Sequence, residues 1–371
     1  MIRVLVDGVI YRLQEYGGVN RYFTETFDRV GHHSNDVQII LHVPARCQGA
    51  LPNRTWIRHV KDWNLTPRSF PNLNLSLSVM SKAIAWTLRP QIFHSTYYTA
   101  PYWSGLRSVV TVHDFIHERF PAMLDDRSFI ARKRHVIEGA DAIIANSHST
   151  KDDILKYTQA QESKIVVIYR GVSETLLSAP LPKEEFDSLL KKHGCSPPYW
   201  LYVGQRGWYK NFGTLLRAFA RISRQVDGYL VAIGGSDCLE QWEVDFLIEN
   251  RLEQRVIVLS AVDDQVLAAA YHNAAGFAYP SLAEGFGIPL LEAMACGAPI
   301  IASDIPVFHE IASDAALYFD PHDEEALAKA MTDVLDKPTR RDLAEKGRKR
   351  VTEFSWDKCA AETVNVYKSL I

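Results

Sequence analysis

Short apolar runs alternate with segments of helical periodicity along the whole of this 371-residue chain. In Phe212–Ser223, for example, the apolar residues fall on one face of a helix; they are Leu215, Leu216, Phe219 and Ile222. Strands that alternate with helices form parallel sheets covered by helices on both faces. The chain is therefore expected to fold as a doubly wound α/β protein.

The predicted strands form two successive groups. In the first half they are Arg3–Val6, Val37–His42, Ile92–His94, Ser108–Val112, Ala142–Ala145 and Ile165–Ile168. In the second half they are Trp200–Val203, Tyr229–Ile233, Val256–Leu259, Gly276–Tyr279, Pro299–Ala302 and Leu317–Phe319. A charged helical segment and Pro197-Pro198 separate the groups, and 47% hydrophobic residues suffice for two cores. We predict two Rossmann-like domains, residues 1–175 and 176–355, with ligands at the carboxyl ends of their strands.

The stretch Glu284–Gly297, EGFGIPLLEAMACG, follows one of these strands and is typical of a loop, a helix and a glycine stop. Its first backbone N–H groups, those of Gly285, Phe286, Gly287 and Ile288, lie where a helix N-terminus favours an anion. Glu284 and Glu292 border the same place, and a carboxylate beside a phosphate is repulsive unless it accepts hydrogen bonds from hydroxyls. The combination indicates a ligand with both phosphate and sugar hydroxyls, such as a nucleotide sugar.

Two cations follow the strand Trp200–Val203, in the loop GQRGWYKN. Arg206 and Lys210 suit a diphosphate, and they would stabilise the charge that develops on a leaving phosphate. Asn211 is placed to cap the next helix. No two Asp residues are separated by a single residue, so a compact D-x-D metal site is missing, and the two cations would replace a divalent metal. We expect neither a metal nor a cofactor.

His113 follows the strand Ser108–Val112, in the run HDFIH. A neutral imidazole there would bind a sugar hydroxyl or transfer a proton, and a packed structural histidine is the simpler alternative. A third alternative is a metal site of His113, Asp114 and His117, although the run lies too close to its strand for a settled helix.

Weaker candidates also follow predicted strands. Paired glycines that include Gly18 enter a helix, Asn146 follows Ala142–Ala145, and the backbone of Val262 is placed to contact a base. Ser149 begins an S-x-x-D pattern, which predicts a helix cap. The chain has no GxGxxG, GxxxxGK[ST] or GxSxG motif, which argues against dehydrogenases, P-loop NTPases and ordinary α/β-hydrolases.

Charge and composition limit the partners and the location. The net charge of −3 gives no support for nucleic acid. Five scattered cysteines and an N-terminus that reads as a strand indicate a cytoplasmic protein, and no apolar run reaches the length of a membrane span. Residues 1–180 carry 21 Lys and Arg against 16 Asp and Glu, which favours an anionic acceptor or membrane surface, or simply a solvated face. Leu75–Trp86 is apolar enough for peripheral contact with the inner face of the plasma membrane, with a partly buried helix as the alternative.

From end to end, the chain resembles the retaining glycosyltransferases of family 4. The motifs that carry the resemblance are GGVNRY, TVHDFIHERFP, ADAIIANSHSTKDDI, VIYRGVSE, LYVGQRGWYKN, VIVLSAVDD, YPSLAEGFGIPLLEAMACGAPIIASDIP and FSWDKCAAETVNVYKSL. The resemblance implies the GT-B fold, in which two Rossmann-like domains face each other across a cleft. It also implies that the last helix, within residues 356–371, packs back on the N-terminal, acceptor-binding domain.

The resemblance also implies roles for individual residues. The catalytic set is His113, Arg206, Lys210 and Glu284. Glu284 matches the glutamate on the transferred sugar, Glu292 the one on the ribose, and Arg206 and Lys210 the cations on the diphosphate. The remaining sugar-donor contacts are Gly18, Val262, Gly285, Phe286, Gly287, Ile288 and Leu290. The R-x3-K spacing is shorter than the commoner family spacing, with Arg206 one place later.

The implied activity is transfer of a hexose, with retained anomeric configuration, from a UDP-glucose or GDP-mannose type of nucleotide sugar. The acceptor would be a saccharide or a lipid-linked saccharide of surface-polysaccharide synthesis. Front-face attack, with the leaving diphosphate as the base, is the expected route. An epimerase or a non-catalytic nucleotide-sugar-binding protein of the same fold is the alternative, and it would need no acceptor.

Overall fold

The computed structural model describes residues 1–15, 17–43, 47, 51–61, 83, 85–123, 126–173, 176, 180–236, 238–260 and 262–371. It divides into two compact units. Unit 1 is Met1–Gly171 together with Ser355–Ile371, and unit 2 is Val172–Phe354.

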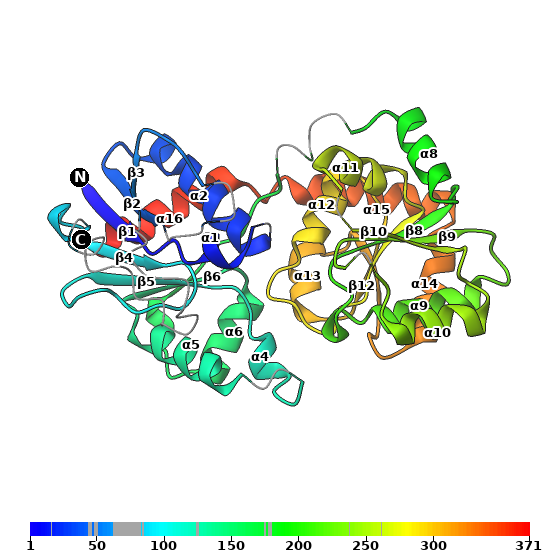
Figure 1. The fold of residues 1–371 in the computed structure, drawn as a ribbon, viewed down its shortest axis with the longest axis horizontal. Helices are drawn as coiled ribbons and strands as arrows, with labels where there is room; N and C mark the ends of the chain where they lie inside the picture. Colours follow the sequence, from blue (N-terminus) through cyan, green and yellow to red (C-terminus); the bar gives the residue numbers. More distant parts are fainter. Residues whose placement is uncertain are drawn as a thin grey trace, which may run out of the picture. The chain divides into compact units, whose positions relative to one another are not determined.

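Unit 1 is a parallel sheet of seven strands in the order β3-β2-β1-β4-β5-β6-β7. The strands are β1 Ile2–Val6, β2 Val37–Val43, β3 Ile57–Lys61, β4 Ile92–Ser95, β5 Arg107–Val112, β6 Ala142–Ala145 and β7 Ile165–Val167. The helices are α1 Ile10–Leu13, α2 Gly18–His33, α4 Ile116–Arg119, α5 Arg127–Gly139, α6 His148–Tyr157 and α16 Trp356–Ser369. Figure 1 shows α2 and α16 on one side of the sheet and α5 and α6 on the other. Helices on both faces explain why these strands are nearly continuous apolar runs.

The C-terminal helix α16 packs against α2 in unit 1. Cys359, Val364 and Tyr367 of α16 are buried in the same core as α2 and β1. The Tyr367 hydroxyl contacts Nδ1 of His94 at 2.6 Å. A Cβ atom at Gly171 would lie 2.2 Å from the backbone nitrogen of Trp356, so only glycine fits where the chain passes the start of α16.

Unit 2 is a parallel sheet of six strands in the order β10-β9-β8-β11-β12-β13. The strands are β8 Tyr199–Val203, β9 Tyr229–Ile233, β10 Val256–Leu259, β11 Gly276–Tyr279, β12 Ile300–Ser303 and β13 Ala316–Phe319. The helices are α8 Lys183–Lys192, α9 Phe212–Ile222, α10 Gln241–Asn250, α11 Asp264–Asn273, α12 Ile288–Cys296, α13 Pro306–Ala312, α14 Glu324–Asp333 and α15 Lys337–Val351. In Figure 1, α11, α12 and α15 cover one side of the sheet, and α9, α10 and α14 cover the other.

The twelve predicted strands are all present, and the doubly wound α/β prediction is confirmed. The sequence did not reveal β3, an edge strand in which charged residues interrupt the apolar ones, as its sequence IRHVK shows. The cap predicted at Ser149 is wrong. Helix α6 begins two residues earlier, where the hydroxyl of Ser147 accepts a hydrogen bond from the Thr150 N–H at 2.9 Å.

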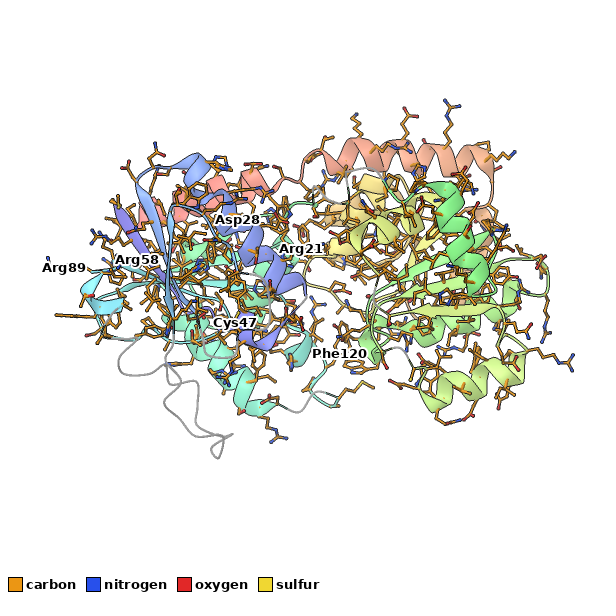
Figure 2. All side chains as sticks on the ribbon, turned by 45° about the horizontal axis from the view of Figure 1, so that its top comes forward. Arg21, Asp28, Cys47, Arg58, Arg89 and Phe120 are labelled. Carbon is orange, nitrogen blue, oxygen red and sulfur yellow. The ribbon has the colours of Figure 1, made fainter. Side chains whose placement is uncertain are left out.

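An arginine lies near each end of the unit 1 sheet. Figure 2 shows Arg89 on the side where the strands begin and Arg21, in the first turn of α2, on the side where they end.

Of the segment Leu75–Trp86, residues 75–82 and 84 lie outside the described residues, and Trp86 is exposed. Within the described ranges, every helix is too short or too polar to span a bilayer.

Candidate active site

A cation and a carboxylate meet after two neighbouring strands of unit 2. Lys210 ends a short 3-10 turn after β8, and Glu284 lies in the loop after β11. The Lys210 Nζ donates to Oε1 of Glu284 at 2.6 Å, and the hydroxyls of Tyr279 and Ser281 each donate to the same oxygen at 2.8 Å. Burial, followed by the Glu284 charge, raises the pKa of Tyr279 well above its ordinary value, so this phenol stays a donor. The three donors orient the Glu284 carboxylate.

Asn211 joins the two loops that carry this ion pair. Its side-chain amide donates to the carbonyl of Pro280 at 3.0 Å, and the Leu282 N–H donates to the Tyr209 carbonyl at 2.8 Å. Asn211 lies at the start of α9 as predicted, but its backbone is left-handed and its side chain makes no cap hydrogen bond to the helix. Its amide holds the loops together instead.

Helix α12 begins beside Glu284. Gly287 has a φ of 97°, which favours glycine, and α12 follows at Ile288 with a proline in its first turn. The helix ends as predicted at Gly297, whose φ is 71° and whose N–H bonds back to Met294 at 3.1 Å. The N-terminus of α12 thus places a partial positive charge next to the Lys210–Glu284 pair.

Glu292 lies further along α12 and is buried. Its Oε2 accepts a hydrogen bond from the hydroxyl of Tyr271 at 3.1 Å. Burial is the main cause, with the Glu292 charge second, of a Tyr271 pKa well above its ordinary value. Val262 follows β10 and is half-buried, directly before Asp263, which caps α11 by accepting from the Val266 N–H.

Arg206 is directed toward the protein interior. Its Nε donates to Glu243 of α10 at 3.1 and 3.3 Å, and its Nη2 donates to the carbonyls of Ser236 and Cys238 at 3.1 and 2.7 Å. The Nη1 makes one long contact of 3.5 Å, to the carbonyl of Gly234. The side chains of Arg206 and Glu243 are 5% and 0% exposed. The guanidinium charge is therefore largely committed to an internal ion pair.

In unit 1, His113 directly follows β5 and is 5% exposed. Its Nδ1 lies 2.6 Å from Nη2 of Arg170, and its carbonyl accepts from the amide of Asn146 at 2.8 Å. Burial and then the Arg170 charge hold the pKa of His113 well below its ordinary value. Gly18, by contrast, is exposed as the first residue of α2.

The structure brings together Lys210, Glu284 and the start of α12, while Arg206 faces Glu243. His113 and Gly18 belong to the other unit. Across the described parts of the chain, no group of three or more His, Cys, Asp or Glu side chains is placed to hold a metal ion. Tyr279 and Ser281 were not predicted as site residues, although both precede the glutamate loop. Arg170 was not predicted either, although it follows a predicted strand.

Comparison with known proteins assigns the family. A model of the group 1 glycosyl transferases matches residues 185–350, and a model of glycosyltransferase family 4 matches residues 16–176. O-antigen chain mannosyltransferase B from Escherichia coli is 29% identical over 77% of this chain and 77% of its own length. O-antigen chain mannosyltransferase RfbU from Salmonella typhimurium is 29% identical over 66% of this chain and 65% of its own. The WbdA mannosyltransferase of Escherichia coli is 25% identical, and the match spans only 40% of that longer protein.

Solved structures agree on the fold. Sucrose-phosphate synthase from Thermosynechococcus elongatus superimposes with a TM-score of 0.79 at 22% identity, over 100% of this chain and 99% of that one. WaaG, a glycosyltransferase involved in lipopolysaccharide biosynthesis, gives a TM-score of 0.72 at 16% identity, over 99% of both chains. The chain therefore belongs to the group 1 glycosyltransferases of the family 4 type and has the GT-B fold. It is an enzyme, a hexosyltransferase, and its relatives include enzymes of O-antigen synthesis.

Proposed function

We propose that this protein transfers a hexose from a nucleoside-diphosphate sugar, with retention of configuration and without a metal, to a saccharide or lipid-linked acceptor. The transfer would serve surface-polysaccharide synthesis, as the names of the O-antigen mannosyltransferases suggest. We place it in the cytoplasm, at the inner face of the plasma membrane. Those names favour a GDP-mannose type of sugar donor over UDP-glucose. We assign sugar-donor binding to unit 2 and acceptor binding to unit 1.

The ion pair beside the start of α12 is the observation that supports the proposal most directly. A diphosphate would accept hydrogen bonds from Lys210 and from the N–H groups at the start of α12, with Gly285 to Ile288 and Leu290 lining the site. Glu284 keeps a second oxygen, Oε2, for which no partner occurs among the described residues, and it is available for sugar hydroxyls. Glu292 would accept from the ribose, and the backbone of Val262 would contact the base.

The environment of Glu284 also supports front-face attack. Three donors, one of them an ammonium group, hold Oε1 of Glu284 in place. We therefore assign Glu284 to holding sugar hydroxyls and assign no protein side chain as the base. The leaving diphosphate, with Lys210 beside it, would take the proton of the acceptor hydroxyl. Arg206 would reach a phosphate only through its Nη1, because its other nitrogens bond within the protein.

A transfer assay tests the proposal. Purified protein is incubated with radiolabelled UDP- and GDP-hexoses and lipid-linked saccharides, in the presence and absence of EDTA, and the product linkage is determined by NMR. We expect an acceptor-dependent α-linked product and full activity with EDTA. Release of nucleoside diphosphate without acceptor dependence, or loss of activity on chelation, would contradict the proposal.

Two variants locate the site. Lys210→Ala and Glu284→Ala should each lower turnover at least roughly tenfold, which corresponds to about 1.4 kcal/mol in the barrier. Lys346→Ala is the matched control, since Lys346 forms an exposed ion pair with Asp342 in the same unit. Near-normal rates in both site variants would show that the sugar donor binds elsewhere.

A further inference from the structure

His113 and Arg170 form a buried contact whose hydrogen-bond direction is determined by chemistry. Nη2 of Arg170 lies 2.6 Å from Nδ1 of His113, and both residues are 5% exposed. A guanidinium has N–H donors and no acceptor. The Nδ1 must therefore accept, and the single proton of the neutral ring resides on Nε2.

The orientation of the His113 ring is held from several sides. The rings of Tyr22 and Phe23 on α2 meet it edge-on, with centroid distances of 5.5 and 5.8 Å. Its backbone carbonyl accepts from the Asn146 amide, and its N–H donates to the hydroxyl of Tyr98 at 3.4 Å. The two aromatic contacts and the Arg170 contact at Nδ1 act on the ring itself and favour this orientation, and the two backbone hydrogen bonds hold the residue in place.

The charged and titratable groups around His113 favour the neutral ring. Besides burial, the pKa is lowered by Arg170, by His94 on β4 and by Lys133 on α5. His94 is itself buried, and its pKa falls to about 3. The Tyr22 hydroxyl remains protonated, because burial raises its pKa. Arg170 and Lys133 are cations, and their charge acts against a second proton on the ring at neutral pH.

Nε2 of His113 and Oδ1 of Asn146 are buried without a hydrogen-bond partner among the described residues. Each unsatisfied atom costs about 1–3 kcal/mol, which a suitable ligand recovers. The first is a donor and the second an acceptor. A hydroxyl accepts and donates at once, whereas a phosphate only accepts, and a metal ion cannot bind a nitrogen that carries a proton. The cluster therefore fits a saccharide hydroxyl.

We propose that Arg170 is a positioning residue for the transfer reaction, which holds His113 as the neutral Nε2–H tautomer so that it donates to a saccharide hydroxyl. This inference rests on the proposed function. It goes beyond that function by assigning His113 to hydrogen-bond donation and not to proton transfer. His113 acts as a fixed hydrogen-bond donor and does not transfer protons between pH 6 and 8.

Nitrogen-15 NMR of the wild-type enzyme tests the tautomer directly. The His113 signals are assigned by their loss in His113→Gln and followed from pH 5.5 to 8.5. We expect an unprotonated Nδ1 and a protonated Nε2 throughout, and an Arg170→Met variant in which the ring titrates or mixes tautomers. Titration of wild-type His113 in this range, or a proton on Nδ1, would overturn the inference.

Kinetics of two amide variants provide a second test. The amide nitrogen of glutamine reaches the position of Nε2, whereas that of asparagine reaches only the position of Nδ1. We expect His113→Gln to retain at least about tenfold more kcat/KM than His113→Asn, with exposed His272→Gln as a control. Equal loss in both, together with an acid limb in the wild-type profile, would assign proton transfer to His113.

These outcomes are separable from the proposed function itself. Failure of that function would appear either as missing transfer activity in the wild-type protein or as an unchanged turnover in Lys210→Ala. The NMR measurement needs no substrate, and it decides the tautomer whatever the sugar donor and acceptor are.

Discussion

Replacing Glu284 by glutamine should strengthen the binding of a free nucleoside diphosphate while it slows sugar transfer. The Lys210 ammonium donates to Oε1 of Glu284 at 2.6 Å. A diphosphate must compete with this carboxylate for the same cation. Glutamine keeps an oxygen for the hydroxyls of Tyr279 and Ser281 but removes the negative charge.

The magnitude follows from the exposure of the pair. The side chains of Lys210 and Glu284 are 16% and 11% exposed, so the ion pair is partly screened and is worth about 1 kcal/mol. Repulsion between the carboxylate and the bound diphosphate adds on the order of 1 kcal/mol. Relief of one or both contributions corresponds to roughly five- to thirtyfold tighter binding. Turnover should fall about tenfold, because the charged acceptor for the sugar hydroxyls is lost.

Calorimetric titration of UDP and GDP into both proteins measures the first effect, and initial rates of transfer measure the second. Asp342→Asn is the matched control, since Asp342 pairs with Lys346 at 2.7 Å on the surface of the same unit. Unchanged or weaker diphosphate binding in Glu284→Gln would refute the competition for Lys210. Unchanged turnover would refute the role of Glu284 on the sugar.

Three further predictions concern stability, each measured by thermal or denaturant unfolding. Arg206→Met should cost about 3–5 kcal/mol by leaving the buried Glu243 carboxylate unpaired, and Glu243→Gln in the same chain should recover part of this; no recovery would contradict the internal ion pair. Gly171→Ala should cost about 1–3 kcal/mol, because its Cβ would lie 2.2 Å from the Trp356 nitrogen, and a neutral effect would contradict this packing of α16. His94, with a folded pKa of about 3 against 6.5 unfolded, binds fewer protons when folded, so its contribution to stability is present above pH 6.5 and lost as the pH falls toward 3. His94→Gln should therefore show a shallower loss of stability between pH 6 and 4, and an unchanged slope would refute this.

The strands were predictable because buried parallel strands are continuous apolar runs bounded by polar loops. The loop containing Glu284 was also predictable, since the stop at Gly297 and the glycine at position 287 are local signals. The exception, β3, lies at the edge of its sheet, and charged residues interrupt its apolar ones. Its pattern resembles a solvated loop as much as a strand.

The ion-pair partners of the charged residues could not be predicted from the sequence, because they are brought together only by the tertiary fold. Arg206 and Glu243 are 37 positions apart. Nothing in the loop GQRGWYKN indicates that Arg206 forms an ion pair with a buried carboxylate on α10. Both arginine and lysine were expected at the diphosphate. The structure gives them different acceptors, so that only Lys210 lies beside Glu284.

The order of the strands explains why the two units place polar groups differently. In an open parallel sheet, a crevice forms where the order reverses, which is between β8 and β11 in unit 2 and between β1 and β4 in unit 1. The loops after β8 and β11 carry Lys210 and Glu284, so the ion pair lies at the point in unit 2 where the proposed diphosphate would compete for Lys210.

The corresponding place in unit 1 is already filled by the protein. Asp7, at the end of β1, is fully buried and accepts hydrogen bonds from the Thr96 N–H at 3.0 Å, the Val9 N–H at 3.2 Å and the Thr99 hydroxyl. All of these donors belong to the protein, so the hydrogen bonds of the Asp7 carboxylate are made without a ligand. Two buried atoms without a hydrogen-bond partner among the described residues, Nε2 of His113 and Oδ1 of Asn146, lie after β5 and β6 instead. A saccharide in unit 1 is therefore expected at those loops, away from the point where the strand order reverses.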